Sequence, residues 1–389
     1  MFPLLDGYRA IAALLVLTTH VAFTTGESFS PVVGPLLGRM DFGVTLFFVL
    51  SGFLLYRPWA RSAMAASSPP RLGTYALRRS GRILPAYWAM VVFTILVLPE
   101  IQPVPWDFWV VHLGLLHIYI PGFTLEGLTQ TWSLATEVSF YVLLPLLAWL
   151  AGRRHRGDPS RSSKSQLWVI AGLATLTWVF IIGRSTLFDG GTGLSGFWII
   201  SHLDWFAVGM TAAVVSTRLE RPDPPRWMNR VVDLARETPI CLGVAAAIYV
   251  IAATPLGGPI DLVDGTGTQI AVKHAAFAII AIFFLLPGFF GRWDAGSTWS
   301  RFLQHPVVVY LGTISYGIFL WHLVLLRLIV DVFNLSIFGG GFIPVLIATV
   351  LVSVLAATAS WFVLERPVQR WTHRRGNATG RQRLPSPAP

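Results

Sequence analysis

The feature that most constrains this chain is a series of long apolar runs separated by short polar loops. A helix needs about 20 mostly apolar residues to cross roughly 30 Å of hydrocarbon. Ten runs approach or reach that length, at residues 8–24, 42–56, 83–98, 132–150, 167–183, 197–216, 240–253, 270–290, 307–330 and 342–364. Because a helix satisfies its own backbone in lipid, the sequence predicts an all-α integral membrane protein with about ten transmembrane helices.

The composition supports a membrane setting and disfavours other classes. The 389 residues are 54% hydrophobic and 12% charged, which is more apolar surface than one soluble core of this length buries. The net charge of +10 does not indicate a nucleic-acid partner, because the basic residues gather in short loops between the apolar runs. The single cysteine, Cys241, excludes an intramolecular disulfide.

The distribution of basic residues predicts the orientation. With a cytoplasmic amino terminus, 24 of the 29 Lys and Arg residues fall in cytoplasmic segments, and the carboxy terminus is also cytoplasmic. A further aromatic stretch, 106–120, would move a basic cluster to the wrong side if it crossed. We therefore predict a re-entrant or interfacial segment near the outer face. Residues 1–370 form the predicted transmembrane domain, and 371–389 a disordered basic cytoplasmic tail.

Two ionisable residues, Arg9 and His20, lie within the first apolar run. Eleven residues at about 100° each return to nearly the same helix face, and the rise separates the two side chains by about 16 Å. Polar groups are costly in hydrocarbon, so this stripe indicates a functional path. A packed histidine with one hydrogen bond is the alternative for His20.

Glu137 is predicted at a similar depth, near the outer end of the fourth full span. A carboxylate beside an imidazole fixes its tautomer and raises its basicity, as a general base requires. We therefore expect Glu137 to orient His20. The alternative is a structural ion pair between Glu137 and an interior arginine.

Arg79 and Arg82 are predicted at the cytoplasmic start of the third span. Free backbone N–H groups and the positive end of the helix dipole would there add to the guanidinium charges, which suits phosphate binding. Ordinary anchoring by positive charges explains the same residues.

Two other intramembrane positions have structural alternatives. Ser51 and Gly52, in the second span, permit close helix approach and are predicted to pack against the first span, so packing is favoured over chemistry for Ser51. His322 is either a site residue or a buried structural hydrogen bond.

A metal site is not predicted. Polar residues cluster by depth near the outer face, namely His112, His117, His202, Asp204 and His274. None of them forms a close-spaced ligand pair such as His-x-x-x-His, so we expect no metal cofactor.

Eight short motifs occur in order along residues 5–370. They are LDGYRAIAA at 5–13, the Arg9-x10-His20 spacing, GVTLFFVLSG at 43–52, Arg79-x-x-Arg82, TWSLATEVSFY at 131–141, FAVGM at 206–210, SYGIFLWH at 315–322 and ERP at 365–367. Each is weak alone, but together they closely resemble the acyltransferase 3 family of membrane O-acyltransferases. Tyr8 departs from the smaller or aliphatic residue usual there.

The resemblance implies an enzyme of the cell envelope. It would transfer an acyl group, acetyl or another short one, from cytoplasmic acyl-coenzyme A to a hydroxyl of a polysaccharide, glycolipid or antibiotic. The hydrolase-like extracytoplasmic domain fused to some members is not seen, so we expect a partner protein for any second transfer. A transporter or flippase of an envelope lipid is the alternative class, and a membrane scaffold leaves Arg9 and His20 unexplained.

The resemblance also implies roles for individual residues. His20 would act as the acid and base at the thioester, or as a transient acyl carrier, with Glu137 orienting it. Arg79 and Arg82 would hold the phosphates of acetyl-coenzyme A, and Arg9 would guide its arm inward. The supporting residues within matched motifs are Ser51, Trp132 and His322.

Overall fold

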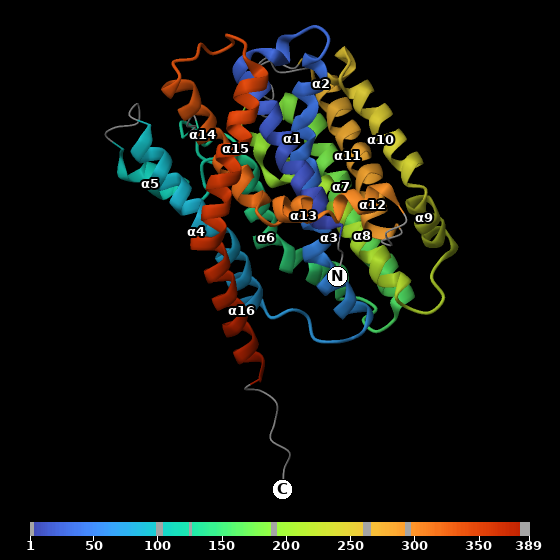
Figure 1. The fold of residues 1–389 in the computed structure, drawn as a ribbon. Coiled ribbons are helices and arrows are strands. Elements are labelled where there is room, and N and C mark those ends of the chain that lie inside the picture. Colours follow the sequence, from blue (N-terminus) through green and yellow to red (C-terminus); the bar gives the residue numbers. More distant parts are fainter. Residues whose placement is uncertain are drawn as a thin grey trace.

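The computed structural model describes residues 4–98, 104–123, 127–187, 193–259, 266–291 and 297–381, and within these ranges it contains helices and no strand. The helices gather into one bundle (Figure 1). The α-helices are α1 Leu5–Thr25, α2 Gly34–Gly38, α3 Gly43–Met64, α4 Leu72–Val97, α5 Trp106–Leu113, α6 Thr131–Gly152, α7 Pro159–Leu187, α8 Leu203–Leu219, α9 Arg226–Arg236, α10 Thr238–Ala252, α11 Gly267–Phe290, α12 Thr298–Leu303, α13 Pro306–Thr313, α14 Ser315–Val332, α15 Phe342–Ser360 and α16 Arg366–Arg381. Short 3-10 turns are η1 Glu27–Phe29, η2 Arg39–Phe42, η5 Leu194–Phe197, η6 Ile199–Ser201 and η7 Pro255–Gly257, and η8 Trp361–Glu365 is π-helical.

Eight helical segments of the described chain are long and apolar enough to cross a bilayer. A ninth results if α9 and α10, bent by 83° at their junction, form one broken span. The prediction of an all-α multi-pass membrane protein is confirmed, but the predicted count of ten is not reached. The predicted span at 197–216 is shorter as a helix, since α8 has 17 residues and the chain before it forms the turns η5 and η6.

The predicted span at 307–330 is two helices. α13 ends at Thr313 and α14 begins at Ser315. α13 packs against α1 and lies across its start (Figure 1). Gly312 makes this crossing possible, because a Cβ there would overlap the backbone of Asp6. The break places the first turn of α14 beside α1.

The aromatic segment 106–120 contains only one short helix, α5. Its eight residues span about 12 Å, so the helix is too short to cross a bilayer. Two side chains of α4 hold it: the Tyr87 hydroxyl donates to the His112 carbonyl at 2.6 Å, and Trp88 Nε1 donates to the Leu113 carbonyl at 3.0 Å. This segment therefore packs against the second half of α4, and its His117 contacts the Thr131 hydroxyl at the start of α6.

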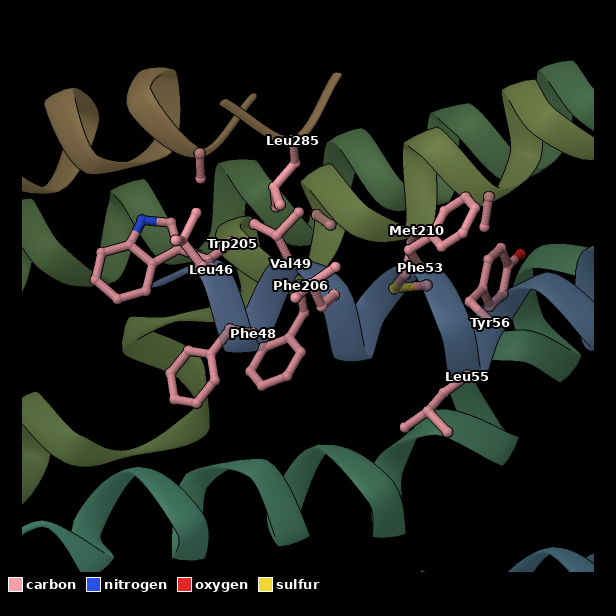
Figure 2. Packing of buried hydrophobic residues seen from close by; sticks show 14 of the residues in the cluster. Leu46, Phe48, Val49, Phe53, Leu55, Tyr56, Trp205, Phe206, Met210 and Leu285 are labelled. Carbon is pink, nitrogen blue, oxygen red and sulfur yellow. The ribbon is translucent and has the colours of Figure 1, made fainter. Parts of the chain in front are cut away.

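Close packing of α3 against α8 forms the centre of the bundle. Figure 2 shows Phe48, Val49 and Phe53 of α3 facing Phe206 and Met210 of α8. A Cβ at Gly52 would overlap the Phe206 carbonyl oxygen. Gly52 therefore packs against α8 and not against the first span as predicted; the close contact of α3 with α1 is made at Gly43, beside the Ala12 carbonyl.

The carboxy-terminal helix continues past the predicted end of the transmembrane domain. Glu365 closes the π-helical turn η8 with its side chain 2% exposed, and Ser360 Oγ donates to it at 3.2 Å. α16 then packs on α4, where Gly81 lies against Thr372 and Val368. The predicted disordered tail, 371–389, thus begins inside α16, and residues 382–389 lie outside the described ranges.

Candidate active site

Five helices enclose a narrow space that we name the arginine cavity. Its polar lining side chains are Arg9 of α1, Ser51 of α3, Arg79 and Arg82 of α4, Ser133, Glu137 and Tyr141 of α6, and Ser315 and Tyr316 of α14. Its volume of about 70 Å³ holds only a few water molecules, at roughly 10–15 Å³ each. The structure thus gathers three of the predicted arginines and Glu137 around one interior space.

Arg79 and Arg82 enter this cavity as unpaired cations. In the part of the chain that the structure describes, neither makes a hydrogen bond or a salt bridge. Arg9 differs, because its Nη1 donates to Asp6 Oδ1 at 2.8 Å. A cavity with unpaired guanidinium groups attracts anions, above all those with several oxygen acceptors.

The predicted helix start at these arginines is wrong. α4 begins at Leu72, so Arg79 and Arg82 lie seven and ten residues inside the helix. Their backbone N–H groups are therefore already used within the helix and cannot bind an anion. Only the guanidinium groups remain for this purpose.

Glu137 is held within the arginine cavity by two hydroxyl groups. Ser51 Oγ donates to Glu137 Oε1, and the Tyr141 hydroxyl donates to the same oxygen at 2.8 Å. The predicted hydrogen bond between Glu137 and His20 does not occur among the described residues. Tyr141 lies one turn further along α6, at the spacing at which helix side chains meet.

His20 is instead paired with His322. The Nδ1–H of His20 donates to the Val16 carbonyl at 2.8 Å, and the Nδ1–H of His322 donates to the Phe319 carbonyl at 2.6 Å. His322 Nε2 is therefore an acceptor, and it lies 3.2 Å from His20 Nδ1. These contacts assign the proton of His20 to Nδ1 and leave its Nε2 as an unprotonated base.

A second space, which we name the histidine cavity, lies beside His20, whereas the arginine cavity lies beside Arg9 on the same face of α1. It has a volume of about 240 Å³ and is lined by His20, His112, His117, Ile118, Phe123, Leu128, Thr129, Gln130, Trp132, Leu194 and Phe197. His112 and His117 come from the α5 segment, and their two imidazole rings stack with centroids 5.4 Å apart. Burial, and then the neighbouring His112, lowers the pKa of His117 to about 4, so this imidazole is neutral near pH 7.

Aromatic side chains separate the two cavities. Phe47, Phe48 and Phe319 line the arginine cavity, and we name these three side chains the aromatic layer. Phe319 lies beside His322, with ring centroids 5.9 Å apart, and Phe48 meets Trp132 edge-on at 6.3 Å. His20 and Trp132 line the histidine cavity from behind this layer. Arg9 and His20, on one face of α1, thus serve opposite sides of it.

The remaining polar residues near this depth do not form a metal centre. His274 Nε2 lies 2.8 Å from Asp204 Oδ1 in a buried pair, and His202 stacks on His274 with centroids 5.9 Å apart. His112 and His117 belong to the histidine cavity instead. Within the described residues, no group of three or more His, Cys, Asp or Glu side chains is arranged to hold a metal ion.

Sequence reasoning missed several residues of the two cavities. Tyr141 and Tyr316 are the main omissions from the arginine cavity, and Gln130 and Thr129 from the histidine cavity. Tyr141 had a detectable signal, since it lies four residues after Glu137. Gln130 had none, because it lies just before α6 and outside the predicted span 132–150.

The bundle and its interior polar stripe define a multi-pass protein of the bacterial membrane. The chain belongs to the acyltransferase 3 family, since residues 2–362 match the family's acyltransferase domain. No solved structure matches it.

Relatives of known name are distant in sequence. The peptidoglycan O-acetyltransferase OatA of Listeria monocytogenes is 25% identical over 365 residues, covering 86% of this chain and 51% of the relative. The O-acetyltransferase OatA of Staphylococcus aureus is 25% identical over 386 residues, covering 95% and 57%. Nodulation protein 10 of Rhizobium leguminosarum is 26% identical over 268 residues, covering 56% and 70%. The chain thus spans about half the length of the two OatA proteins.

Proposed function

We propose that this protein transfers an acetyl or another short acyl group from cytoplasmic acyl-coenzyme A to a hydroxyl of an envelope carbohydrate or glycolipid. The observation that carries the proposal is the His20–His322 pair, which leaves an unprotonated imidazole nitrogen between a cationic cavity and a neutral one. Its relatives named as O-acetyltransferases support the same reaction class.

The donor enters from the arginine cavity. The excess of basic residues in the predicted inner loops supports a cytoplasmic location for this side. Arg79 and Arg82 bind the donor's phosphates through charge-assisted hydrogen bonds. A volume of about 70 Å³ excludes the nucleotide and most of the pantetheine arm, so the phosphates stay at the entrance and only the acyl thioester end passes Arg9 toward His20.

The acceptor hydroxyl reaches His20 from the histidine cavity. His20 Nε2 takes the hydroxyl proton, the oxygen forms a bond to the acyl carbon, and the carbon–sulfur bond breaks. The thiolate then takes the proton from His20, so the base is regenerated. His322 Nε2 accepts a hydrogen bond from the His20 Nδ1–H and stabilises the transient imidazolium.

The aromatic layer controls the meeting of the two substrates. Phe319 lies between the arginine cavity and His322, and rotation of its side chain joins the cavities. Exclusion of bulk water by this layer protects the thioester from hydrolysis.

In this proposal Glu137 is a positioning residue of the donor cavity. Its carboxylate fixes Ser51 and Tyr141 and partly balances the nearby guanidinium charges. Its effect on His20 is indirect.

The test uses the purified full chain in lipid nanodiscs with radiolabelled acetyl-coenzyme A and a soluble chitooligosaccharide. We expect label on the glycan and loss of at least a hundredfold in rate for His20→Ala, as for removal of a general base. The control is His305→Ala, an exposed histidine away from both cavities. Equal rates for the two variants would refute the role of His20. Movement of an envelope lipid between leaflets without acyl transfer would establish the flippase instead.

A further inference from the structure

The histidine cavity contains buried polar atoms that lack a partner. Gln130, 2% exposed, has an unpaired Oε1, and His117, 9% exposed, has an unpaired Nδ1. Both side chains line the cavity. Buried polar atoms in native proteins are nearly always satisfied, so these two indicate a ligand.

The hydrogen bonds made by the other polar atom of each side chain determine whether the unpaired atom is a donor or an acceptor. Gln130 Nε2 donates to the Leu320 carbonyl at 2.9 Å, which assigns the free atom as the amide oxygen. The Thr131 hydroxyl donates to the Leu128 carbonyl at 2.6 Å and so accepts from His117 Nε2–H at 3.1 Å. His117 Nδ1 therefore carries a lone pair. Both unpaired atoms are acceptors.

His20 adds a third acceptor to the same cavity. Its Nδ1 proton is used by the Val16 carbonyl, so Nε2 is unprotonated. A ligand that satisfies three acceptors must present several O–H or N–H donors. A carboxylate or phosphate ligand has no such donors and would be repelled by the lone pairs.

The lining also excludes strong charge and favours an apolar ring face. None of the lining residues in the described chain is Asp, Glu, Lys or Arg. Trp132 and Phe197 form an aromatic corner, with ring centroids 5.0 Å apart and planes at 36°. The C–H face of a pyranose ring is apolar and packs on such rings, while its hydroxyls point outward from the ring edge.

The size of the cavity limits the ligand to one ring. Pockets for drug-sized ligands measure roughly 300–1,000 Å³, and the histidine cavity measures about 240 Å³. An oligosaccharide segment would have to extend outside it.

We infer that the histidine cavity binds one neutral sugar ring of the acceptor, stacked on Trp132 and donating hydroxyl or amide protons to Gln130 and His117. This inference rests on the proposed function, since the same ring presents the hydroxyl that His20 deprotonates. Gln130 and His117 are then the groups that select the acceptor.

The test compares soluble acceptors with the purified chain in nanodiscs. Methyl N-acetylglucosaminide is the neutral probe, and its monodeoxy analogues each lack one donor. The corresponding uronic acid and choline test anionic and cationic ligands. We expect acetylation of the neutral sugar, a KM about tenfold higher for at least one deoxy analogue that keeps the reacting hydroxyl, and no acceptor or inhibitor activity for the uronic acid or choline. Stronger binding of either charged probe overturns the inference.

Variants give an independent measurement. Gln130→Leu removes one acceptor at similar volume and should raise KM for the neutral sugar about tenfold, with a smaller change in kcat. The matched control is Gln369→Leu on α16, outside both cavities. Equal KM values for the two variants overturn the inference, and the deoxy series on the wild-type chain decides the matter if Gln130→Leu does not fold.

The two proposals fail in different ways. Without a sugar, water is the only acceptor. Slow release of coenzyme A and acetate by the wild-type chain, lost in His20→Ala, tests donor activation alone. If donor cleavage occurs but the neutral sugar is neither acetylated nor bound, the sugar site is refuted while the acyltransferase proposal stands. If no donor cleavage occurs with any acceptor, the acyltransferase proposal itself fails.

Discussion

Replacing His322 tests the assignment of the catalytic tautomer. The structure gives His322 one function toward His20: its Nε2 accepts from His20 Nδ1–H at 3.2 Å. In the transition state His20 becomes cationic, and a hydrogen bond to a charged group contributes about 1.5–3 kcal/mol. The Val16 carbonyl still accepts the same proton at 2.8 Å. We therefore expect the lower part of that range for His322→Leu, about 1.5–2 kcal/mol, or a 10- to 30-fold loss of kcat.

A second substitution at the same position separates the hydrogen bond from packing. His322→Gln supplies an amide oxygen that can accept from His20, so it should retain more activity than His322→Leu. The assay is single-turnover acyl transfer by the full chain in nanodiscs, with thermal unfolding as a measure of folding and His305→Leu as an exposed control. Wild-type rates for His322→Leu, or equal rates for the Leu and Gln variants, would refute the tautomer argument. A loss as complete as that of His20→Ala would make His322 itself the base.

Three further outcomes follow from the packing and charges. Gly52→Ala should lower the free energy of unfolding by about 1–3 kcal/mol, because its Cβ overlaps the Phe206 carbonyl. Gly172→Ala, where a Cβ meets open space, is the control and should leave it unchanged; equal thermal shifts for the two variants would contradict this. Arg82→Ala should raise KM for acetyl-coenzyme A about tenfold, because a charge-assisted hydrogen bond to the donor is lost. The control is Arg154→Ala at an exposed position, and unchanged donor affinity of Arg82→Ala in a binding assay would remove Arg82 from the donor site. Glu137→Gln keeps the oxygen that accepts from two hydroxyls, so it should lose far less kcat than His20→Ala; an equal loss would restore direct contact between carboxylate and imidazole.

Most of the architecture could be predicted because its causes are local. Apolar length and composition indicate a spanning helix without reference to any other segment. The breaks were harder to predict. Nothing near Ile314 in the sequence requires the chain to turn there, and the turn is stabilised by contact of Gly312 with Asp6, more than 300 residues earlier.

The site could be predicted in its members but not in its pairs. Helical periodicity alone places Arg9 and His20 on one face of α1, and both line interior cavities. Depth along the membrane suggested that Glu137 would meet His20, but depth does not specify direction around the bundle axis. The lateral order of helices decides that, and it turns Glu137 toward Ser51.

The sequence by itself determined that this protein resides in a membrane and which ionisable side chains lie within it, because hydrophobic length and helix period act within a single segment. Only the tertiary structure decided that His20 is paired with His322, 302 residues away, and that two acceptors remain unpaired beside it. A hydrogen bond between distant helices depends on their rotation and lateral order, and the packing of α3, α8, α13 and α14 sets both.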